Sequence, residues 1–273
     1  MGIESMKYVI VIPARNEVNR IVHTLKSIFN QTVKPVKVVV VDDGSRDGTG
    51  CVARRLGTTV VRVERRTNEN LSGTPYIAYL INRGLEIAEK LDLDYVMISG
   101  ADCVYPPTYV EEITRRMRQD KAVIASGVAH GEVTREYGVR GAGRLIDAKW
   151  FRGIGFRYPE NYGFEPWLVF RALKDGMKVA VYKDIAFSLL RETKVSPRKA
   201  YLWGKAMRAL NYFWLYALGR CLLFALKSPK LGLRMLSGYL RKAKKYRDIE
   251  DFVPSFQRSI FLRRIEELLG TIF

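Results

Sequence analysis

Two short apolar segments near the start of the chain are each followed by residues that can bind a ligand. The segments cover residues 8–13 and 36–41, and their valines and isoleucines are typical of buried parallel strands. Parallel strands end at one edge of a sheet, where open α/β sheets bind ligands, so we expect the residues that follow to share one site. These residues are Pro13, Ala14, Arg15, Glu17, Asp42 and Asp43.

Asp42 and Asp43 bring carboxylate oxygens, which accept hydrogen bonds from the N–H of a nucleobase or from the hydroxyls of a ribose. An ordinary structural interpretation is also open. The Asp-Asp-Gly-Ser sequence at 42–45 suits a turn followed by a helix cap. Taken alone, this segment therefore leaves both a binding role and a structural role open.

Two further carboxylates stand where strands or helices are expected to end or begin. Asp102 follows the apolar run at 95–99, and Glu165 opens a helical pattern at 165–174. A carboxylate at a strand end can hold Mg²⁺ or Mn²⁺ together with phosphate oxygens and water. A carboxylate beside an acceptor hydroxyl can take its proton as it attacks. Their structural alternatives are a loop cap for Asp102 and a first-turn helix acid for Glu165.

The sequence PARNE at 13–17, followed by VDDGS at 41–45, resembles the opening of the family-2 glycosyltransferases. These are inverting enzymes of the GT-A fold, which move a sugar from a nucleotide diphosphate to an acceptor. The resemblance covers about residues 6 to 185. It implies a UDP- or GDP-sugar donor held by Arg15, Glu17, Asp42 and Asp43, with Pro13 and Ala14 framing the base.

Two later segments resemble the family with departures. Where the family has an Asp-x-Asp pattern, this chain has Gly100 in place of the first acid and Asp102 as the second. The resemblance therefore implies that Asp102 contacts the donor and its Mg²⁺ or Mn²⁺ ion. Counted back from Arg171, Glu165 occupies the position of the family's catalytic base, and Phe164 replaces the acid before it. Inversion by direct displacement requires such a carboxylate to take the acceptor proton.

Arg140 and Arg144 lie in a stretch rich in Gly and Arg, from 130 to 163, which is expected to be mostly loop with one short helix around 145–151. Their position between the predicted sheet and the predicted base suits closure over the diphosphate. A solvated loop is the alternative.

The elements that must position these residues alternate between strand and helix. Apolar runs predict strands at 8–13, 36–41, 59–63, 95–99, 122–127 and 177–182, and helical periods follow residue 17 and cover 77–91 and 165–174. This order, with the resemblance, predicts an α/β fold of GT-A type with a mixed, mostly parallel sheet flanked by helices. We expect residues 1–190 to form the nucleotide-sugar-binding and catalytic domain, and 191–273 a basic helical appendage.

The charge of the chain is concentrated in that appendage. Of the net charge of +18, residues 191–247 hold fifteen Lys and Arg against one acid, Glu192. We expect one amphipathic helix to run through 208–227, a second basic helix after Pro229 to about Arg247, and a third carrying Phe256 and Ile260. Basic residues flanking an apolar, aromatic helix suit an anionic membrane surface, although packing on the catalytic domain and insertion remain alternatives.

Composition limits the cellular setting and the class. At 273 residues and 48% hydrophobic content, the chain supports a substantial core. Three dispersed cysteines argue against a disulfide framework or a zinc site, and no secretory signal is recognisable. We therefore expect a cytoplasmic enzyme, peripheral to the cytoplasmic face of the cell membrane, in cell-envelope or glycolipid synthesis.

Other functions remain open or are disfavoured. A dinucleotide oxidoreductase would need a glycine-rich loop after the first strand, which is absent here. The basic tail would permit a nucleic-acid binder, although no nucleic acid is expected, and Gly100 would permit a catalytically silent nucleotide-sugar binder. Within the enzyme class, a hydroxyl on a lipid-linked saccharide, glycolipid or polysaccharide is the expected acceptor. The alternative is a polyprenyl phosphate, as in the dolichol-phosphate mannose synthases.

Overall fold

The computed structural model describes residues 6–270, apart from residues 66, 68, 133–136 and 193–194. The chain forms two compact units. Unit 1 consists of Met1–Leu71, Ile77–Tyr158 and Gly176–Glu192, and unit 2 of Ser72–Tyr76, Pro159–Asp175 and Thr193–Phe273. The segments 72–76 and 159–175 thus group with the C-terminal helices. The assignment of the catalytic function to residues 1–190 and of the basic appendage to 191–273 stays a prediction.

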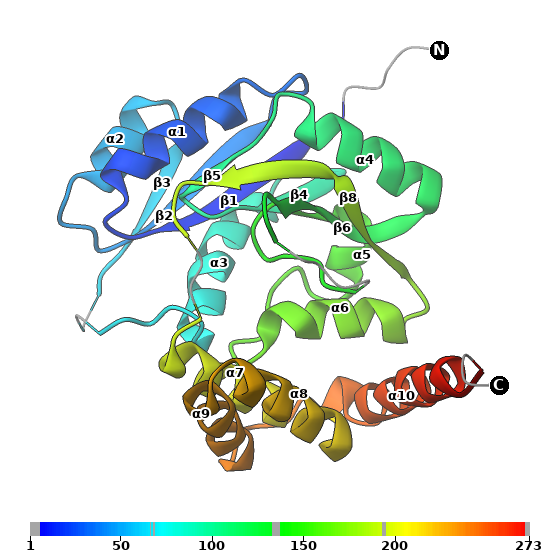
Figure 1. The fold of residues 1–273 in the computed structure, drawn as a ribbon. Coiled ribbons are helices and arrows are strands. Elements are labelled where there is room, and N and C mark those ends of the chain that lie inside the picture. Colours follow the sequence, from blue (N-terminus) through cyan, green and yellow to red (C-terminus); the bar gives the residue numbers. More distant parts are fainter. Residues whose placement is uncertain (1–5, 66, 68, 133–136, 193–194, 271–273) are drawn as a thin grey trace. The chain divides into compact units, whose positions relative to one another are not determined.

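Unit 1 is built on a sheet that, within the described residues, has eight strands in the order β3-β2-β1-β4-β7-β6-β8-β5 (Figure 1). The strands are β1 (Tyr8–Ala14), β2 (Lys37–Asp43), β3 (Thr59–Val63), β4 (Tyr95–Ile98), β5 (Cys103–Val104), β6 (Ala122–Ala129), β7 (Arg144–Asp147) and β8 (Lys178–Leu189). The pairs β1–β2, β1–β4, β2–β3 and β6–β8 are parallel, whereas β7 runs antiparallel to both β4 and β6. The prediction of an α/β fold with a mixed, mostly parallel sheet is confirmed.

Helices connect the strands of unit 1. They are α1 (Val18–Phe29), α2 (Thr49–Arg55), α3 (Pro75–Ala88), α4 (Tyr109–Asp120) and α5 (Ala148–Gly153). The helix α4 was not predicted, because its outward face is strongly polar. Its buried residues, including Tyr109, Ile113 and Met117, recur at helical spacing and supply its packing face.

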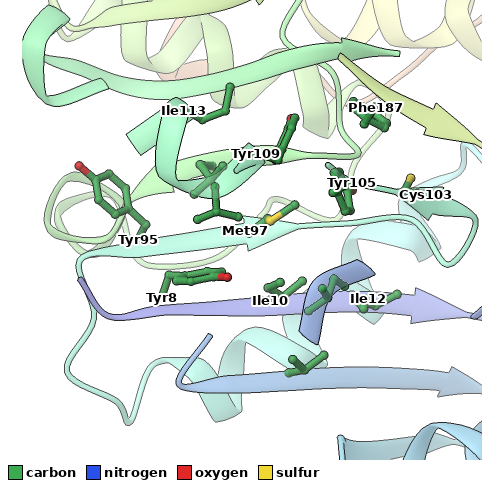
Figure 2. Packing of buried hydrophobic residues seen from close by; sticks show 14 of the residues in the cluster. Tyr8, Ile10, Ile12, Tyr95, Met97, Cys103, Tyr105, Tyr109, Ile113 and Phe187 are labelled. Atoms are coloured by element: carbon green, nitrogen blue, oxygen red, sulfur yellow. The ribbon is translucent and has the colours of Figure 1, made fainter. Parts of the chain in front are cut away.

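The core of unit 1 follows from side-chain alternation along β1. Ile10 and Ile12 belong to one buried cluster with Met97 of β4 and Ile113 of α4 (Figure 2). Val11 points to the other face, where a Cβ on Gly84 of α3 would lie 2.4 Å from Val11 Cγ1. Because β1 is buried on both faces, its sequence is an unbroken apolar run. The same packing fixes the position of its carboxyl end.

Unit 2 is helical in its described residues. Its helices are α6 (Phe164–Lys174), α7 (Pro197–Ala209), α8 (Trp214–Lys227), α9 (Pro229–Leu240), the 3₁₀ turn η1 (Arg247–Ile249) and α10 (Phe252–Gly270). The expected single helix through 208–227 is wrong: α7 ends at Ala209, and Asn211 has a left-handed φ of 54° before α8 begins. The expected second basic helix ends at Leu240 instead of near Arg247.

Glycines let α7 and α9 approach closely. A Cβ at Gly204 would lie 2.0 Å from the carbonyl oxygen of Met235, and one at Gly238 would lie 2.1 Å from that of Tyr201. Only residues without a side chain permit this backbone contact. In the part of the chain that the structure describes, no helix combines the length and the apolar character needed to cross a membrane.

Candidate active site

The carboxyl ends of β1 and β2 meet, as their parallel register requires. Ala14 stands beside Asp42, which is fully buried. Asp42 Oδ1 accepts a hydrogen bond of 3.0 Å from the Ser45 amide, and Oδ2 accepts one of 2.8 Å from Arg62 Nη1. The Asp42 carboxylate is therefore held in one orientation at the edge of the sheet.

Hydrogen bonds join the loop after β1 to the loop after β2. The amide of Asn16 donates to Ser45 Oγ at 3.0 Å, and Asn16 Oδ1 accepts from the Arg46 amide at 2.9 Å. The Glu17 amide donates to Thr49 Oγ1 at 2.8 Å. Asn16 adopts a left-handed φ of 51°, a conformation that Asn tolerates better than most residues. The two predicted binding segments thus form one connected structure.

Asp43 is buried and forms an ion pair with the buried side chain of Arg65. Arg65 also donates through Nε to the carbonyl oxygen of Thr67 at 2.7 Å. A buried carboxylate is stable only with such a partner, because taking its charge out of water is costly. Pro13 and Arg15, at the end of β1, are half-buried, and Ala14 between them is buried.

Asp102, after β4, is linked to Glu17 by an arginine that sequence reasoning missed. Arg191 Nη2 donates to Glu17 Oε1 at 2.8 Å and to Asp102 Oδ2 at 3.1 Å, and Arg191 Nε reaches the same Asp102 oxygen at 3.2 Å. Burial lowers the pKa of Arg191, but the charges of the two carboxylates outweigh it, so its pKa is raised. No sequence signal set Arg191 apart, because the predicted strand stops at residue 182 and Lys183 is the first cation after it.

Gly100 leaves room for the Asp102 side chain. A Cβ at position 100 would lie 2.9 Å from Asp102 Oδ1 and 3.2 Å from Cys103 Sγ. The present position of the Asp102 carboxylate therefore depends on glycine at the place where the family pattern has an acid. Burial raises the pKa of the neighbouring Cys103 thiol to about 11.

The residues around Asp102 fit a divalent ion in their chemistry. Glu17 and Asp102 already converge on one cationic group, and hard ions take carboxylate oxygens together with phosphate and water. No group of three or more His, Cys, Asp or Glu side chains with metal-binding geometry occurs among the described residues. A metal ion here would take most of its ligands from the diphosphate and solvent.

The two predicted loop arginines differ in their surroundings. Arg140 forms an ion pair with Glu132, and its guanidinium lies 5.8 Å from the ring centroid of Phe187. Arg144 is instead the first residue of β7 and is only 1% exposed. Its guanidinium donates to the carbonyl oxygen of Val139 at 2.9 Å. The prediction that Arg144 lies in a loop free to close over a diphosphate is therefore wrong.

Glu165 lies in unit 2, in the first turn of α6, and is half-buried. Gly163 precedes the helix with a left-handed φ of 79°, and a Cβ there would lie 2.8 Å from Leu210 Cδ1. Glycine at this position therefore lets the start of α6 pack closely against Ala206 and Leu210 within unit 2. The Trp167 indole donates to Asp248 Oδ2 at 2.9 Å and ties the same turn to η1.

Solved structures of GT-A glycosyltransferases share this fold. One is the mannosyltransferase PcManGT from Pyrobaculum calidifontis in complex with GDP-Man and Mn²⁺, with a TM-score of 0.56 and 16% identity over 85% of this chain and 68% of that chain. Another is glucosyl-3-phosphoglycerate synthase from Mycobacterium tuberculosis in complex with Mn²⁺, UDP and glucosyl-3-phosphoglycerate. Its TM-score is 0.56 at 16% identity, over 74% of this chain and 78% of that one. At such identities the likeness concerns the fold, and the predicted GT-A architecture is confirmed.

The chain belongs to glycosyl transferase family 2, whose sequence profile matches residues 9–167. This confirms the resemblance seen in PARNE and VDDGS. The chain is also similar to 4,4'-diaponeurosporenoate glycosyltransferase from Staphylococcus aureus strain MRSA252, with 50% identity over 70 residues. That match spans 26% of this chain and only 18% of the curated relative.

Proposed function

We propose that the chain is an inverting glycosyltransferase that moves a sugar from a UDP- or GDP-sugar to a hydroxyl of a lipid-linked saccharide, glycolipid or polysaccharide. The observation that carries this proposal is the grouping of Glu17, Asp42 and Asp102 at the ends of β1, β2 and β4, inside the region that matches the family. Open α/β sheets bind nucleotides at such strand ends.

In this proposal the nucleotide contacts Asp42 and Asp43, with Pro13, Ala14 and Arg15 framing the base. Support comes from the rigidity of the two carboxylates, which are buried and oriented by Arg62 and Arg65. A site that is already ordered loses little conformational freedom when a ligand binds. Arg140 stays a candidate for contact with the diphosphate, whereas buried Arg144 is better explained as part of the core.

Asp102 is proposed to hold Mg²⁺ or Mn²⁺ against the diphosphate. When bound, the ion would neutralise the charge that develops on the leaving nucleotide diphosphate. Both solved structures named above are complexes with Mn²⁺, which supports this choice for the present chain.

Glu165 is proposed as the general base. It takes the proton of the acceptor hydroxyl while that oxygen forms a bond to the anomeric carbon and the bond to the diphosphate breaks. Its support is the match of Glu165 to the position of the family's base, counted from Arg171, and its place in the first turn of α6. General acid–base catalysis of this kind typically contributes about 10²- to 10⁴-fold in rate.

A membrane surface is the proposed location of the acceptor, with residues 191–273 as the attachment region and the cytoplasmic face of the cell membrane as the site of action. Support comes from α8, whose outward face is apolar: Leu222 is 58% and Leu226 84% exposed. Lys227 and Lys230 follow directly and are exposed, which suits anionic headgroups. The name of the Staphylococcus aureus relative is consistent with a lipid-like acceptor.

The first test is a panel of nucleotide sugars, each added with Mn²⁺ or Mg²⁺ and followed by thermal unfolding. A donor that binds the folded chain raises the melting temperature by linkage. With that donor and an acceptor extract, release of nucleotide diphosphate measures turnover. If no nucleotide sugar shifts the melting temperature with either ion, the proposed function is wrong.

The second test is Glu165→Gln, which should lower turnover by about 10²- to 10⁴-fold and leave the thermal shift with donor unchanged. The matched control is Glu112→Gln, which removes another first-turn helix acid, in α4, and should keep full turnover. Full turnover of Glu165→Gln at saturating substrates would exclude Glu165 as base and favour an acceptor that is already ionised, such as a polyprenyl phosphate.

A further inference from the structure

Arg191 places one positive charge between two carboxylates that come from different strand ends. Its Nη2 atom contacts both Glu17 Oε1 and Asp102 Oδ2, at 2.8 and 3.1 Å. Glu17 follows β1 and Asp102 follows β4, so the guanidinium bridges the edge of the sheet at which the ligand of an α/β protein is expected.

The backbone fixes the position of this arginine. Cys103 of β5 pairs with Leu189 of β8, and the Leu190 amide donates to the carbonyl oxygen of Asp102 at 2.8 Å. Arg191 is the next residue along the chain. The start of its side chain is therefore held beside Asp102, and among the described residues the polar partners of the guanidinium are Glu17 and Asp102.

Exposure differs sharply between the cation and its partners. The side chain of Arg191 is 53% exposed, against 9% for Glu17 and 18% for Asp102. The carboxylates are thus held by the fold, while the guanidinium can turn toward solvent without opening the core. Half-exposed ion pairs stabilise a protein only weakly, so exchange to another partner costs little.

A nucleotide diphosphate changes the balance of charges at this edge. Its phosphate oxygens would be repelled by Glu17 and Asp102, but they are a strong partner for a guanidinium, which binds phosphate through two parallel N–H groups. A divalent ion has the opposite preference and favours the carboxylates. Arg191 therefore has two carboxylate partners in the free protein and a stronger partner, the diphosphate, in the complex.

We propose that Arg191 is an exchanging counter-ion of the donor site. In the free protein it holds Glu17 and Asp102 and competes with metal ions for them. When donor and metal ion arrive together, Asp102 is released to the ion and the guanidinium turns to the diphosphate, where it stabilises the charge of the leaving group. This inference rests on the proposed function and makes metal binding dependent on the nucleotide.

Mn²⁺ binding, measured by electron paramagnetic resonance of the free ion, tests the exchange without any need for turnover. In the native chain Mn²⁺ alone should bind weakly, and addition of UDP or GDP should tighten it. Arg191→Gln should tighten the binding of Mn²⁺ alone by about tenfold, because Asp102 loses its competing cation. The same variant should weaken UDP or GDP binding in the presence of Mn²⁺ by about tenfold to a hundredfold, measured by calorimetry.

Arg20→Gln is the matched control. Arg20 Nη1 contacts Glu17 Oε2 at 2.9 Å, so the control removes an equal charge from the same carboxylate while Asp102 stays paired with Arg191. It should leave both affinities within about twofold of the native values. Arg191→Lys, which keeps the charge but lacks the planar fork, should bind nucleotide at an intermediate affinity and guards against loss of folding.

Two results overturn the inference while leaving the proposed function intact. One is unchanged affinity for both Mn²⁺ and nucleotide in Arg191→Gln, which would make the arginine an ordinary surface ion pair. The other is equal effects of Arg20→Gln and Arg191→Gln, which would indicate a general charge effect. A native chain that binds no nucleotide with either metal would instead contradict the proposed function itself.

Discussion

Gly50 lies against the carboxylate of Asp42 so closely that a Cβ at position 50 would stand 2.5 Å from Asp42 Oδ2. Gly50 belongs to α2, which follows the loop after β2. Glycine in this helix, where it lowers helix stability, therefore preserves the position of a buried carboxylate at the proposed nucleotide site.

Gly50→Ala should displace Asp42 and weaken donor binding by roughly tenfold or more, because a well-ordered contact to the nucleotide is lost. It should also lower the free energy of unfolding by about 1–3 kcal/mol through overpacking. Calorimetry and chemical denaturation measure the two effects. Gly153→Ala is the control, since a Cβ there meets nothing within 4 Å. Native affinity in Gly50→Ala would show that Asp42 has room to move or does not contact the donor.

The ion pairs of Asp42 and Asp43 should differ in their contribution to stability. Arg65 is 7% exposed and Arg62 59%. Arg65→Met leaves the buried charge of Asp43 without this partner, at a cost of about 3–5 kcal/mol. Arg62→Met should cost less, about 1–3 kcal/mol, because the Ser45 amide still donates to Asp42 and water reaches the site of the exposed guanidinium. Chemical denaturation of the two variants tests the contrast. Equal losses would mean that exposure does not decide the strength of these pairs.

The apolar face of α8 should control membrane binding. Leu222→Ser combined with Leu226→Ser should reduce flotation with anionic liposomes at least about tenfold, because burial of each leucine contributes roughly 1.5–3 kcal/mol. The control is Val36→Ser with Met177→Ser, which removes two exposed apolar side chains from unit 1. Unchanged flotation, with a change of oligomeric state in sedimentation, would identify this face as a contact between proteins.

Alkaline pH should destabilise unit 1 through its buried tyrosines. Burial raises the pKa of Tyr8 and of Tyr109 above the ordinary value of 10.0. The unfolded chain therefore loses these protons first as the pH rises, so their contribution to stability is complete below about pH 10 and declines above it. Urea midpoints at pH 9, 10 and 11 should fall in that order, and Tyr8→Phe should flatten the decline. Phenolate absorbance from all fifteen tyrosines of the native chain at pH 11 would contradict this expectation.

Those parts of the fold with a strong local pattern were predictable. The strands β1, β2 and β3 were found from β-branched runs, and α6 from its helical period. β5 has two residues and no pattern of its own, because it exists only through pairing with β8. Arg144 was misplaced because an arginine suggests solvent, whereas here the Val139 carbonyl oxygen and the Tyr158 hydroxyl accept from its buried guanidinium.

Part of the candidate site was also predictable from local sequence patterns. The positions of Glu17, Asp42 and Asp102 after three strands followed from strand prediction and from the resemblance to the family. Arg191 was not predictable, because its partner Glu17 lies 174 residues away and such a contact leaves no periodic signal. A pairing of this kind depends on the register of β5 against β8, which single-sequence patterns do not specify.

The hydrogen bonds between Asn16 and Ser45, and between Glu17 and Thr49, have a consequence for how this chain can be altered. Each loop satisfies polar groups of the other, so the shape of each depends on both. In a chimera of two relatives, PARNE transplanted without the loop at 42–49 would lose the Ser45 and Thr49 hydroxyls that accept from its amides. The reverse exchange would lose Asn16 Oδ1, which accepts from the Arg46 amide. The two segments therefore have to be exchanged together, although 24 residues separate their ends in the chain.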